Sequence, residues 1–267
     1  MNKLSFKDSY FFTTHNITNR QVEEITGIGK STASYCNKKY GLQSLQKYKK
    51  NDKFVFGKID TKEKAYTLGF ILADGSIDIK NIIDIKISIQ DKEVLEFIGD
   101  VVNSNIFDDM TFNRKARRFP SSRINKKIPD ITKFTGGRLK EERHFPRIRK
   151  DLEPYLLQGF FDGDGCITWG RRKDRNRLWQ KVSFTSQLKL LEGVQQYLYK
   201  NNISTVIHPK NGEGCYVLQI CNKEDVLKMY NLIYSDKDFI ILRRKFVKFN
   251  ALRLELEENG EGSEKLR

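Results

Sequence analysis

The sequence lacks the cysteine and histidine patterns from which many metal and redox sites are built. Its four cysteines form no C-x-x-C pair, and its three histidines lie far apart without an H-x-x-x-H spacing. A zinc ribbon, a redox dithiol and a histidine-based nuclease finger are therefore not expected. If this chain carries out phosphate chemistry, carboxylates must be its catalytic groups.

Long apolar runs are also missing. The longest, such as residues 69–73, have only a few residues, so no transmembrane helix fits. Lys3, Lys7 and Asp8 interrupt the N-terminus, which shows no signal-peptide core. We expect an intracellular protein, in a bacterium, a phage-infected cell or an organelle, that is neither secreted nor attached to a membrane.

Negative charge is scarce. The 267 residues include 49 Lys and Arg against 34 Asp and Glu, which gives a formal net charge of +15. The polar tail 255–267 is acidic, with five Glu and two basic residues, so residues 1–254 carry +18. With 38% hydrophobic residues the chain can build a core. A folded, basic protein indicates an acidic partner, and nucleic acid is the commonest one.

Residues 1–50 predict a small N-terminal helical domain. Thr18 and Gln21 have the spacing of a capping box, a glycine-containing break follows at 27–29, and a second helix is expected over 30–40. Helix, glycine turn and polar helix indicate a helix-turn-helix DNA-binding module. A helical cap on the main domain is the alternative. As a DNA reader, the second helix would present Lys30, Ser31, Ser34, Tyr35 and Lys38.

The rest of the chain predicts two similar α+β halves, 51–150 and 151–267. A helix over 61–74 precedes alternating isoleucines from 77 to 89, which indicate a hairpin turning near Asn81, and a helix over 91–103. The second half repeats this order, with helices at 152–164, 188–199, 225–234 and 241–256 and strands near 205–208 and 216–220. This is an internal duplication. The first half offers only weak further strands, near 110–116 and 128–134.

One stretch concentrates the basic charge. Residues 113–150 hold 14 Lys and Arg against three acids, interleaved with phenylalanines. A solvated loop is the usual explanation for a charge run, but a run this long and of one sign indicates a surface that follows phosphates. Its first candidate contacts are Arg114, Lys115, Arg117 and Arg118.

The strongest feature is a pair of matching helix ends, LGFILADG at 68–75 and LQGFFDGDG at 157–165. Each has two small residues four apart, on one helix face, which lets two helix backbones approach closely. Each ends in Asp-Gly, and the glycine is expected to supply a left-handed helix cap. The small pairs are Gly69 with Ala73 and Gly159 with Gly163.

The two terminal aspartates are electrostatically unusual. A carboxylate at a helix C-terminus faces the negative end of the helix dipole, so Asp74 and Asp164 are disfavoured there. If the helices pair, the two carboxylates converge and need a cation. Mg²⁺ prefers oxygen ligands, and two carboxylates beside a phosphate suit metal-assisted displacement. Two ordinary Asp-Gly turns are the alternative, which the in-register repetition disfavours.

These segments resemble the paired signature of LAGLIDADG homing endonucleases, in a single-chain member with two repeats. The second copy matches at Leu157, Gly159, Asp162, Gly163, Asp164 and Gly165. The first has Leu72 where the family has its earlier aspartate, a position that packs and caps and does not carry the reaction. The resemblance covers about 60–267, and residues 1–50 resemble helix-turn-helix modules appended to some homing endonucleases.

The resemblance implies two pseudo-twofold-related αββαββ repeats, whose signature helices pair and whose saddle-shaped antiparallel sheets straddle duplex DNA. Asp74 and Asp164 would hold Mg²⁺ or Mn²⁺, with the backbone next to Asp74 left open as a further ligand. A polar residue near the attacking water is implied at Gln90 and, in the second repeat, at Ser186 or Gln187. A basic residue reaching the scissile phosphate is implied among Arg243, Arg244 and Lys245, and less strongly at Lys140 or Arg143.

The outward faces of the hairpins would then read bases or phosphates of a long, asymmetric target. Lys80, Lys86 and Ser88 would project from the first sheet. From the second, the expected contacts are Thr168, Arg171, Arg172, Arg175, Arg177, Lys181, Ser183 and Thr185.

The function that this resemblance implies is a site-specific, Mg²⁺-dependent double-strand DNA endonuclease that acts as a monomer. An intron-splicing maturase, which would bind intron RNA, and a non-cleaving DNA-binding regulator are the alternatives on the same fold. The presence of both aspartates disfavours the regulator.

Overall fold

The structure is a computed structural model that describes residues 56–112, 118–171, 178–210 and 214–264, and, before them, only 28, 29, 31, 32 and 35. The chain forms two compact units, residues 48–240 and residues 1–47 together with 241–267. The described part of the latter is essentially helix α10 (Arg243–Glu264). The predicted helix-turn-helix lies almost wholly outside the described residues, and the predicted domain boundaries stay predictions.

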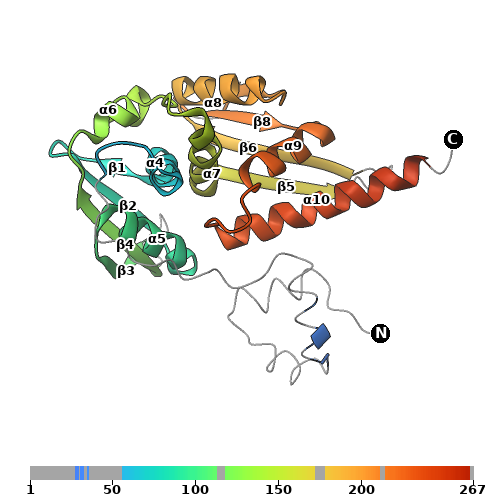
Figure 1. Cartoon of the computed structure of the whole chain (residues 1–267), viewed down its shortest axis with the longest axis horizontal. Coiled ribbons are helices and arrows are strands. Elements are labelled where there is room, and N and C mark those ends of the chain that lie inside the picture. The colour runs from blue at the N-terminus through green and yellow to red at the C-terminus, as the bar shows by residue number, and fades with distance from the viewer. Residues whose placement is uncertain are drawn as a thin grey trace. The chain divides into compact units, whose positions relative to one another are not determined.

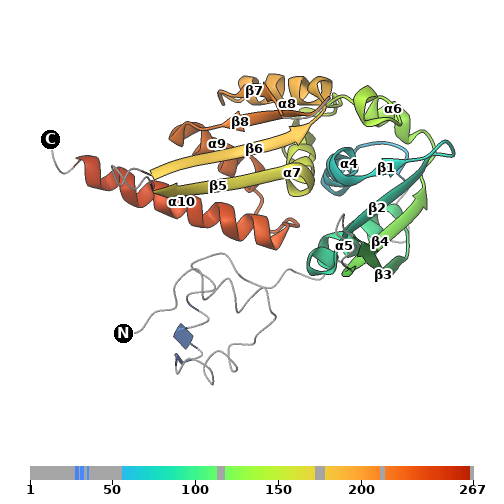
Figure 2. The ribbon, with the colours of Figure 1, turned by 180° about the vertical axis from the view of Figure 1, so that it is seen from behind.

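Residues 48–240 contain two successive series of elements (Figures 1 and 2). The first is α4 (Lys62–Asp74), β1 (Ser76–Ile77), β2 (Ile82–Ser88), η1 (Ile89–Asp91), α5 (Lys92–Val102), β3 (Ile106–Phe112), β4 (Arg118–Lys127), α6 (Ile131–Thr135), η2 (Lys140–Glu142) and η3 (Lys150–Leu152). The second is α7 (Glu153–Asp164), β5 (Gly165–Arg171), β6 (Leu178–Ser186), α8 (Leu188–Lys200), β7 (Val206–Pro209), β8 (Tyr216–Ile220) and α9 (Lys223–Ile233).

Both series build a four-stranded antiparallel sheet with the same topology. The strand order is β1-β2-β4-β3 in the first sheet and β5-β6-β8-β7 in the second. Helix α5 covers the first sheet, α8 and α9 cover the second, and α4 and α7 lie side by side between the sheets (Figures 1 and 2). The predicted α+β class and the two similar halves are confirmed.

Local sequence explains where these elements begin and turn. The Thr61 side chain accepts a hydrogen bond from the Lys64 backbone N–H and caps α4, and a proline in the first turn of α7 suits its start. Asn81 adopts a left-handed conformation, with φ of 59°, at the predicted hairpin turn. Asn tolerates that conformation better than most residues. Ile83, Ile85 and Ile87 then point into the core, as their alternation predicts.

Two predictions in the first half are wrong. The alternation of isoleucines from 77 to 89 predicts that Ile79 shares the apolar face of the hairpin, but β1 ends at Ile77 and the Ile79 side chain is 79% exposed in the turn. The strand expected over 128–134 is instead a turn followed by α6, because Asp130 takes a left-handed conformation after a proline. The real strand, β4, reads RFPSSRINKK, and its few apolar residues hide the alternation.

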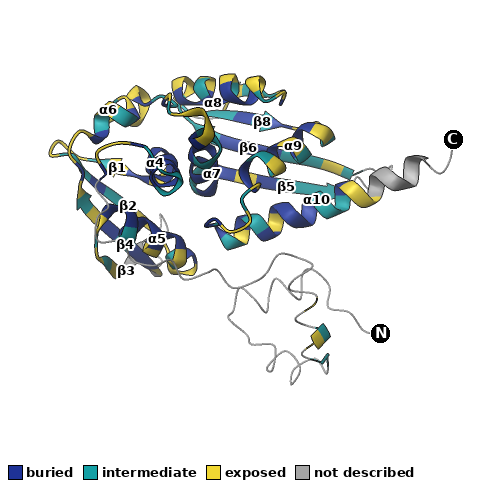
Figure 3. Cartoon of the chain, viewed as in Figure 1, coloured by how far each residue is buried: buried dark blue, intermediate teal, exposed yellow. Residues whose placement is uncertain are grey.

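The core of this unit runs through the helix pair. Every residue of α4 from Lys64 to Ala73 is buried, and so are residues 156–162 of α7. Figure 3 shows the buried colour along these two helices and in parts of the strands. A charged residue that ends such a helix, as Asp74 does, therefore marks the point where the core meets solvent.

Candidate functional site

Helices α4 and α7 meet through two glycines in a reciprocal arrangement. A methyl group on Gly69 would overlap the Leu156 carbonyl oxygen and lie 2.7 Å from the Phe160 nitrogen. A methyl group on Gly159 would overlap the Tyr66 carbonyl and lie 3.0 Å from the Phe70 nitrogen. Counted back from Asp74 and Asp164, the contacting positions are the same on both helices. The predicted close pairing is therefore present, and its contacts follow a pseudo-twofold relation.

This pairing brings the two terminal carboxylates to the same end of the helix pair. A methyl group on Gly163, next to Asp164, would lie 3.4 Å from the Asp74 Oδ2 and would overlap the Ala73 side chain. Asp74 is exposed and Asp164 is half-buried. Both predicted metal aspartates thus lie at one solvent-facing end of the interface.

The glycines after the aspartates have a different reason from the one predicted. Gly75 and Gly165 have φ of −75° and −73°, in the extended region, so neither is a left-handed cap. A side chain is excluded by space. A methyl group on Gly75 would lie 2.6 Å from the Ile71 carbonyl oxygen, and one on Gly165 would overlap the Phe161 ring. Glycine is needed for this close approach at the helix end.

Asp162, the earlier acidic residue of the second signature, faces the other helix. It is buried, and its Oδ2 accepts a 2.8 Å hydrogen bond from the Tyr66 hydroxyl. The Tyr66 ring packs edge-on against Phe97 and Phe239. The carboxylate therefore bridges the two helices inside the core, in agreement with the packing role that the family resemblance implies for this position.

The two basic candidates of the first half differ in access. Arg143 is only 1% exposed, so its guanidinium does not reach a phosphate, and its candidacy for that role is wrong. The guanidinium instead donates to carbonyl oxygens at the end of α4. Lys140 is exposed at the same place and donates to the Ala73 carbonyl oxygen at 3.1 Å. Lys140 remains the candidate for a phosphate contact.

The outward face of the first sheet is polar. Lys86 and Ser88 are exposed on β2, opposite the buried isoleucines, while Lys80 is exposed in the hairpin turn. Cross-strand pairing sets Lys86 against Arg123 of β4. Arg123, which sequence reasoning missed, donates through Nε and Nη2 to the Asp84 carboxylate at 2.6 and 3.0 Å. The only sequence signal for this role of Arg123 was that polar residues flank Ile124 on both sides, as they do in a strand with one buried face.

The second sheet places its predicted contacts unequally. Thr168 pairs with Lys181 across β5 and β6, and both are half-buried, as is Thr185. Arg171 is exposed at the end of β5. Ser183 is only 7% exposed, which leaves it little access to a base.

The residues that the family resemblance implies near the attacking water and the scissile phosphate lie at or near the ends of helices and strands. Gln90 is exposed in η1, two residues after β2, where the Ser88 hydroxyl accepts from its backbone N–H. Gln187 is half-buried directly after β6, at the start of α8. Arg243 and Arg244 open α10, in the other compact unit, where Arg243 is half-buried and Arg244 exposed. Their roles stay predictions.

Several predicted DNA contacts lie outside the described residues. Of the N-terminal group, only Ser31 and Tyr35 are described, and both are exposed. Arg118 begins β4, with its side chain undescribed. The remaining ones are Lys30, Ser34, Lys38, Arg114, Lys115, Arg117, Arg172, Arg175 and Arg177.

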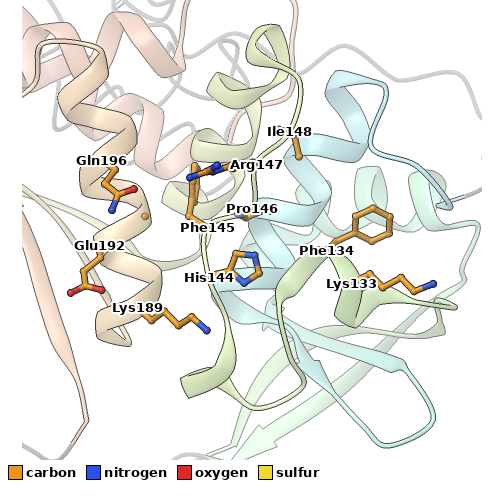
Figure 4. A pocket seen from close by; sticks show the side chains of 11 residues that line it. Lys133, Phe134, His144, Phe145, Pro146, Arg147, Ile148, Lys189, Glu192 and Gln196 are labelled. Carbon is orange, nitrogen blue, oxygen red and sulfur yellow. The ribbon is translucent and has the colours of Figure 1, made fainter.

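A pocket of about 510 Å³ lies elsewhere, between α6, the connecting segment 144–148 and α8 (Figure 4). His144, Phe145 and Arg147 line it from the connecting segment, and Lys133 and Lys189 from the two helices. None of the predicted site residues lines it. The paired carboxylates thus lie outside this pocket.

Comparisons with known proteins agree with this geometry. Residues 151–234 match the family model described as a LAGLIDADG-like domain. A structure of I-SmaMI, a meganuclease bound to uncleavable DNA, is 12% identical, with a TM-score of 0.51 over 76% of this chain and 96% of its own. A point mutant of I-SmaMI gives 0.52, with 14% identity over 76% and 95%. I-GzeII, a LAGLIDADG homing endonuclease in complex with its DNA target, gives 0.50, with 10% identity over 73% and 91%.

The curated proteins contain no match to this sequence. Within the residues that the structure describes, no helix is long and apolar enough to cross a membrane. The family model and the solved structures therefore support a statement about the fold: residues 151–234 match the LAGLIDADG-like domain model and, across both halves, the chain has the fold of the LAGLIDADG homing endonucleases.

Proposed function

We propose that this protein is a site-specific double-strand DNA endonuclease that uses a divalent cation and acts as a monomer. One observation carries the proposal: two aspartates from two paired helices end at the same solvent-facing point of a pseudo-twofold interface. A duplex has its own local twofold relation between strands. A pseudo-symmetric pair of carboxylates is therefore matched to two phosphodiester bonds, one on each strand.

The donor set suits Mg²⁺ or Mn²⁺. Carboxylate oxygens are the ligands that these cations prefer, and Mg²⁺ usually takes one or two carboxylates together with water and phosphate oxygens. In the described part of the chain, no group of three or more His, Cys, Asp and Glu side chains is suited to hold a metal. Asp74 and Asp164 would hold the cation, which when bound activates water and stabilises charge on the phosphate.

The polar strand faces would hold the duplex. The surface opposite the core carries Lys86 and Arg123 in the first sheet, and Thr168 and Lys181 in the second. Such side chains donate to base edges and phosphates, while the net charge of +15 favours a polyanion. Residues 1–50 would add a reading module on one flank of the target.

A cleavage selection tests the proposal. A library of DNA duplexes is incubated with full-length protein and Mg²⁺, and the cut ends are sequenced. The library includes the chromosomal sequence that flanks the reading frame, joined as it is when the reading frame is absent. We expect one dominant site. Asp74→Asn and Asp164→Asn should each lower cleavage at that site by more than about 100-fold, because each removes a cation ligand.

Binding should be nearly unchanged in both variants, because affinity comes from many phosphate contacts. Asp130→Asn is the matched control, since it removes the same charge at an exposed position where Asn tolerates the left-handed backbone. Full cleavage by either site variant would overturn the assignment of that aspartate. Specific binding without any cleavage by wild-type protein would favour the regulator, and binding to intron RNA alone would favour the maturase.

A further inference from the structure

The carboxyl end of α4 is closed by a segment that lies about 70 residues further along the chain. The last four carbonyls of a helix have no intrahelical partner, and α4 has no Lys or Arg in its last turn. The Gly75 backbone N–H donates a hydrogen bond to the Ile71 carbonyl oxygen at 3.0 Å. Lys140 donates a hydrogen bond to the Ala73 carbonyl oxygen at 3.1 Å. Arg143 donates to the Ile71 and Leu72 carbonyl oxygens, each at 3.2 Å.

Arg143 makes most of these contacts from a buried position. Its Nη1 also donates to the Gly75 carbonyl oxygen at 2.9 Å, and its Nη2 donates to the Arg138 carbonyl at 3.2 Å. The backbone oxygens on both sides of Asp74, those of Leu72 and Gly75, are therefore held by one nitrogen atom. This geometry fixes the direction in which the backbone leaves the helix at Asp74.

The positive charge of the buried Arg143 guanidinium must be balanced by negative charge nearby. Among the described residues, no carboxylate is hydrogen-bonded to it, and its Nε is buried without a hydrogen-bond partner. Burial lowers the pKa of Arg143, while the negative charges of Asp164 and Glu141 raise it. Burying a cation without compensating negative charge is strongly unfavourable. The negative end of α4 and the Asp164 carboxylate supply the compensation.

The connecting segment is held on both sides of Arg143. The His144 backbone N–H donates to the Thr135 carbonyl oxygen at 3.1 Å, and the Phe145 ring lies 5.8 Å from that of Tyr197 on α8. Lys189 of α8 donates to the Glu142 carbonyl oxygen at 3.4 Å. The guanidinium thus enters from a segment that contacts α6 in the first half and α8 in the second.

We propose that Arg143 is the positioning residue of the paired carboxylates. It holds the backbone that carries Asp74 and places a fixed positive charge near Asp164, so that the two carboxylates are in register before a divalent cation binds. The identity of the ligand rests on the proposed function, whereas the contacts of Arg143 do not. The role differs from a phosphate contact, which its burial prevents.

The direction in which metal affinity changes when Arg143 is replaced distinguishes a positioning role from a purely electrostatic effect of its charge. Removing a nearby positive charge would, by Coulomb attraction alone, tighten the binding of a cation. Losing the contacts that hold Asp74 would weaken it, and loss of supporting contacts around a metal site typically costs about 10- to 100-fold in metal affinity. A role in stability alone would leave the affinity of the folded protein unchanged.

Mn²⁺ titration of the full-length protein, read from the electron paramagnetic resonance signal of unbound Mn²⁺, makes this measurement without relying on cleavage. We expect Arg143→Met to weaken Mn²⁺ binding by about tenfold or more. Arg143→Lys keeps the charge but cannot span the same carbonyls, so it should also weaken Mn²⁺ binding, with no Coulomb gain to offset the loss. Arg147→Met is the matched control, because Arg147 is exposed and lines the pocket of Figure 4.

Near-ultraviolet circular dichroism establishes which variants are folded, and if Arg143→Met is not, Arg143→Lys decides. Unchanged or tighter Mn²⁺ binding in the folded variant overturns the proposal. Asp74→Asn is titrated in parallel. If it binds Mn²⁺ like the wild type, the metal site of the proposed function fails. If it loses binding while the Arg143 variants do not, only the positioning role fails.

Discussion

The first and second halves of residues 48–240 share a topology but fill their common interface differently. Tyr66 in α4 and Leu156 in α7 occupy equivalent positions, as do Leu72 and Asp162. The pseudo-twofold relation therefore maps the Tyr66–Asp162 pair onto Leu156–Leu72. One pair is polar and hydrogen-bonded, the other is apolar, and all four residues are buried.

This difference teaches that the two halves are fitted to each other and not to copies of themselves. Two first halves would set Tyr66 against Leu72 and leave a buried hydroxyl without its partner. Two second halves would set Asp162 against Leu156 and bury a carboxylate beside an alkyl group. Both arrangements carry a desolvation cost that the native pairing avoids.

The shared glycine contact is the part of the interface whose disruption should have the largest effect. Gly69→Ala or Gly159→Ala should each lower the free energy of unfolding by more than about 3 kcal/mol, because the added methyl overlaps a backbone carbonyl that cannot rotate away. Urea denaturation measures this. Gly170→Ala is the control, since the nearest neighbours of its methyl would be atoms of the Trp179 side chain, at 3.1 Å or more, and not backbone. Equal effects at Gly69 and Gly170 would refute the close approach.

The polar pair should give an intermediate effect with a distinctive coupling. Tyr66→Phe deprives the Asp162 carboxylate of a donor, and Asp162→Leu leaves the Tyr66 hydroxyl buried without this acceptor. Each should cost about 1–3 kcal/mol. The double variant imitates the apolar pair of the other side, so its cost should be smaller than the sum by about 1 kcal/mol or more. A double-mutant cycle in urea tests this, and strict additivity would contradict it.

The smallest effect is expected at the start of α4. Lys62 and the Tyr155 hydroxyl donate to the Asp236 carboxylate at 2.8 and 3.0 Å, and the hydrogen bond from Lys62 is the main cause of the lowered pKa of Asp236. The pKa is lowered in the folded state, so the stabilisation is present above the unfolded value near 4 and is lost as the pH falls through the folded value.

Asp236→Asn should therefore lower the free energy of unfolding at pH 7 by no more than about 1 kcal/mol, since the pair is partly exposed. The difference from the wild type should shrink towards zero below pH 4. Lys62→Met should show the same pH dependence, because it removes the other partner. A difference that grows as the pH falls would contradict this account.

The sequence predicted the elements whose patterns are local. The ends of α4 and α7 at Asp74 and Asp164, the turn at Asn81 and the strand Tyr216–Ile220 all follow from capping, periodicity and turn residues within a few positions. Strand β4 was missed because its inward positions include serines, which leave no apolar alternation.

The features of the site that escaped prediction depend on contacts between distant segments. Arg143 was predicted, as an alternative to Lys140, to reach the scissile phosphate, because nothing nearby in the sequence indicates that its side chain ends among the carbonyls of α4. Arg123 was hidden for the same reason, since its partner Asp84 lies 39 residues earlier. A charge run therefore mixes surface and buried roles that only the fold separates.

The reciprocal glycine contact also limits how such chains can recombine. A half taken from another two-repeat protein can replace one of these halves only if its helix carries glycine at the position that meets the partner's carbonyl. It must also supply either a tyrosine or an aspartate, on the correct side, to complete the polar pair. Exchange of halves between proteins of this fold is thus governed by a few buried residues, while the outward faces of the sheets can diverge independently.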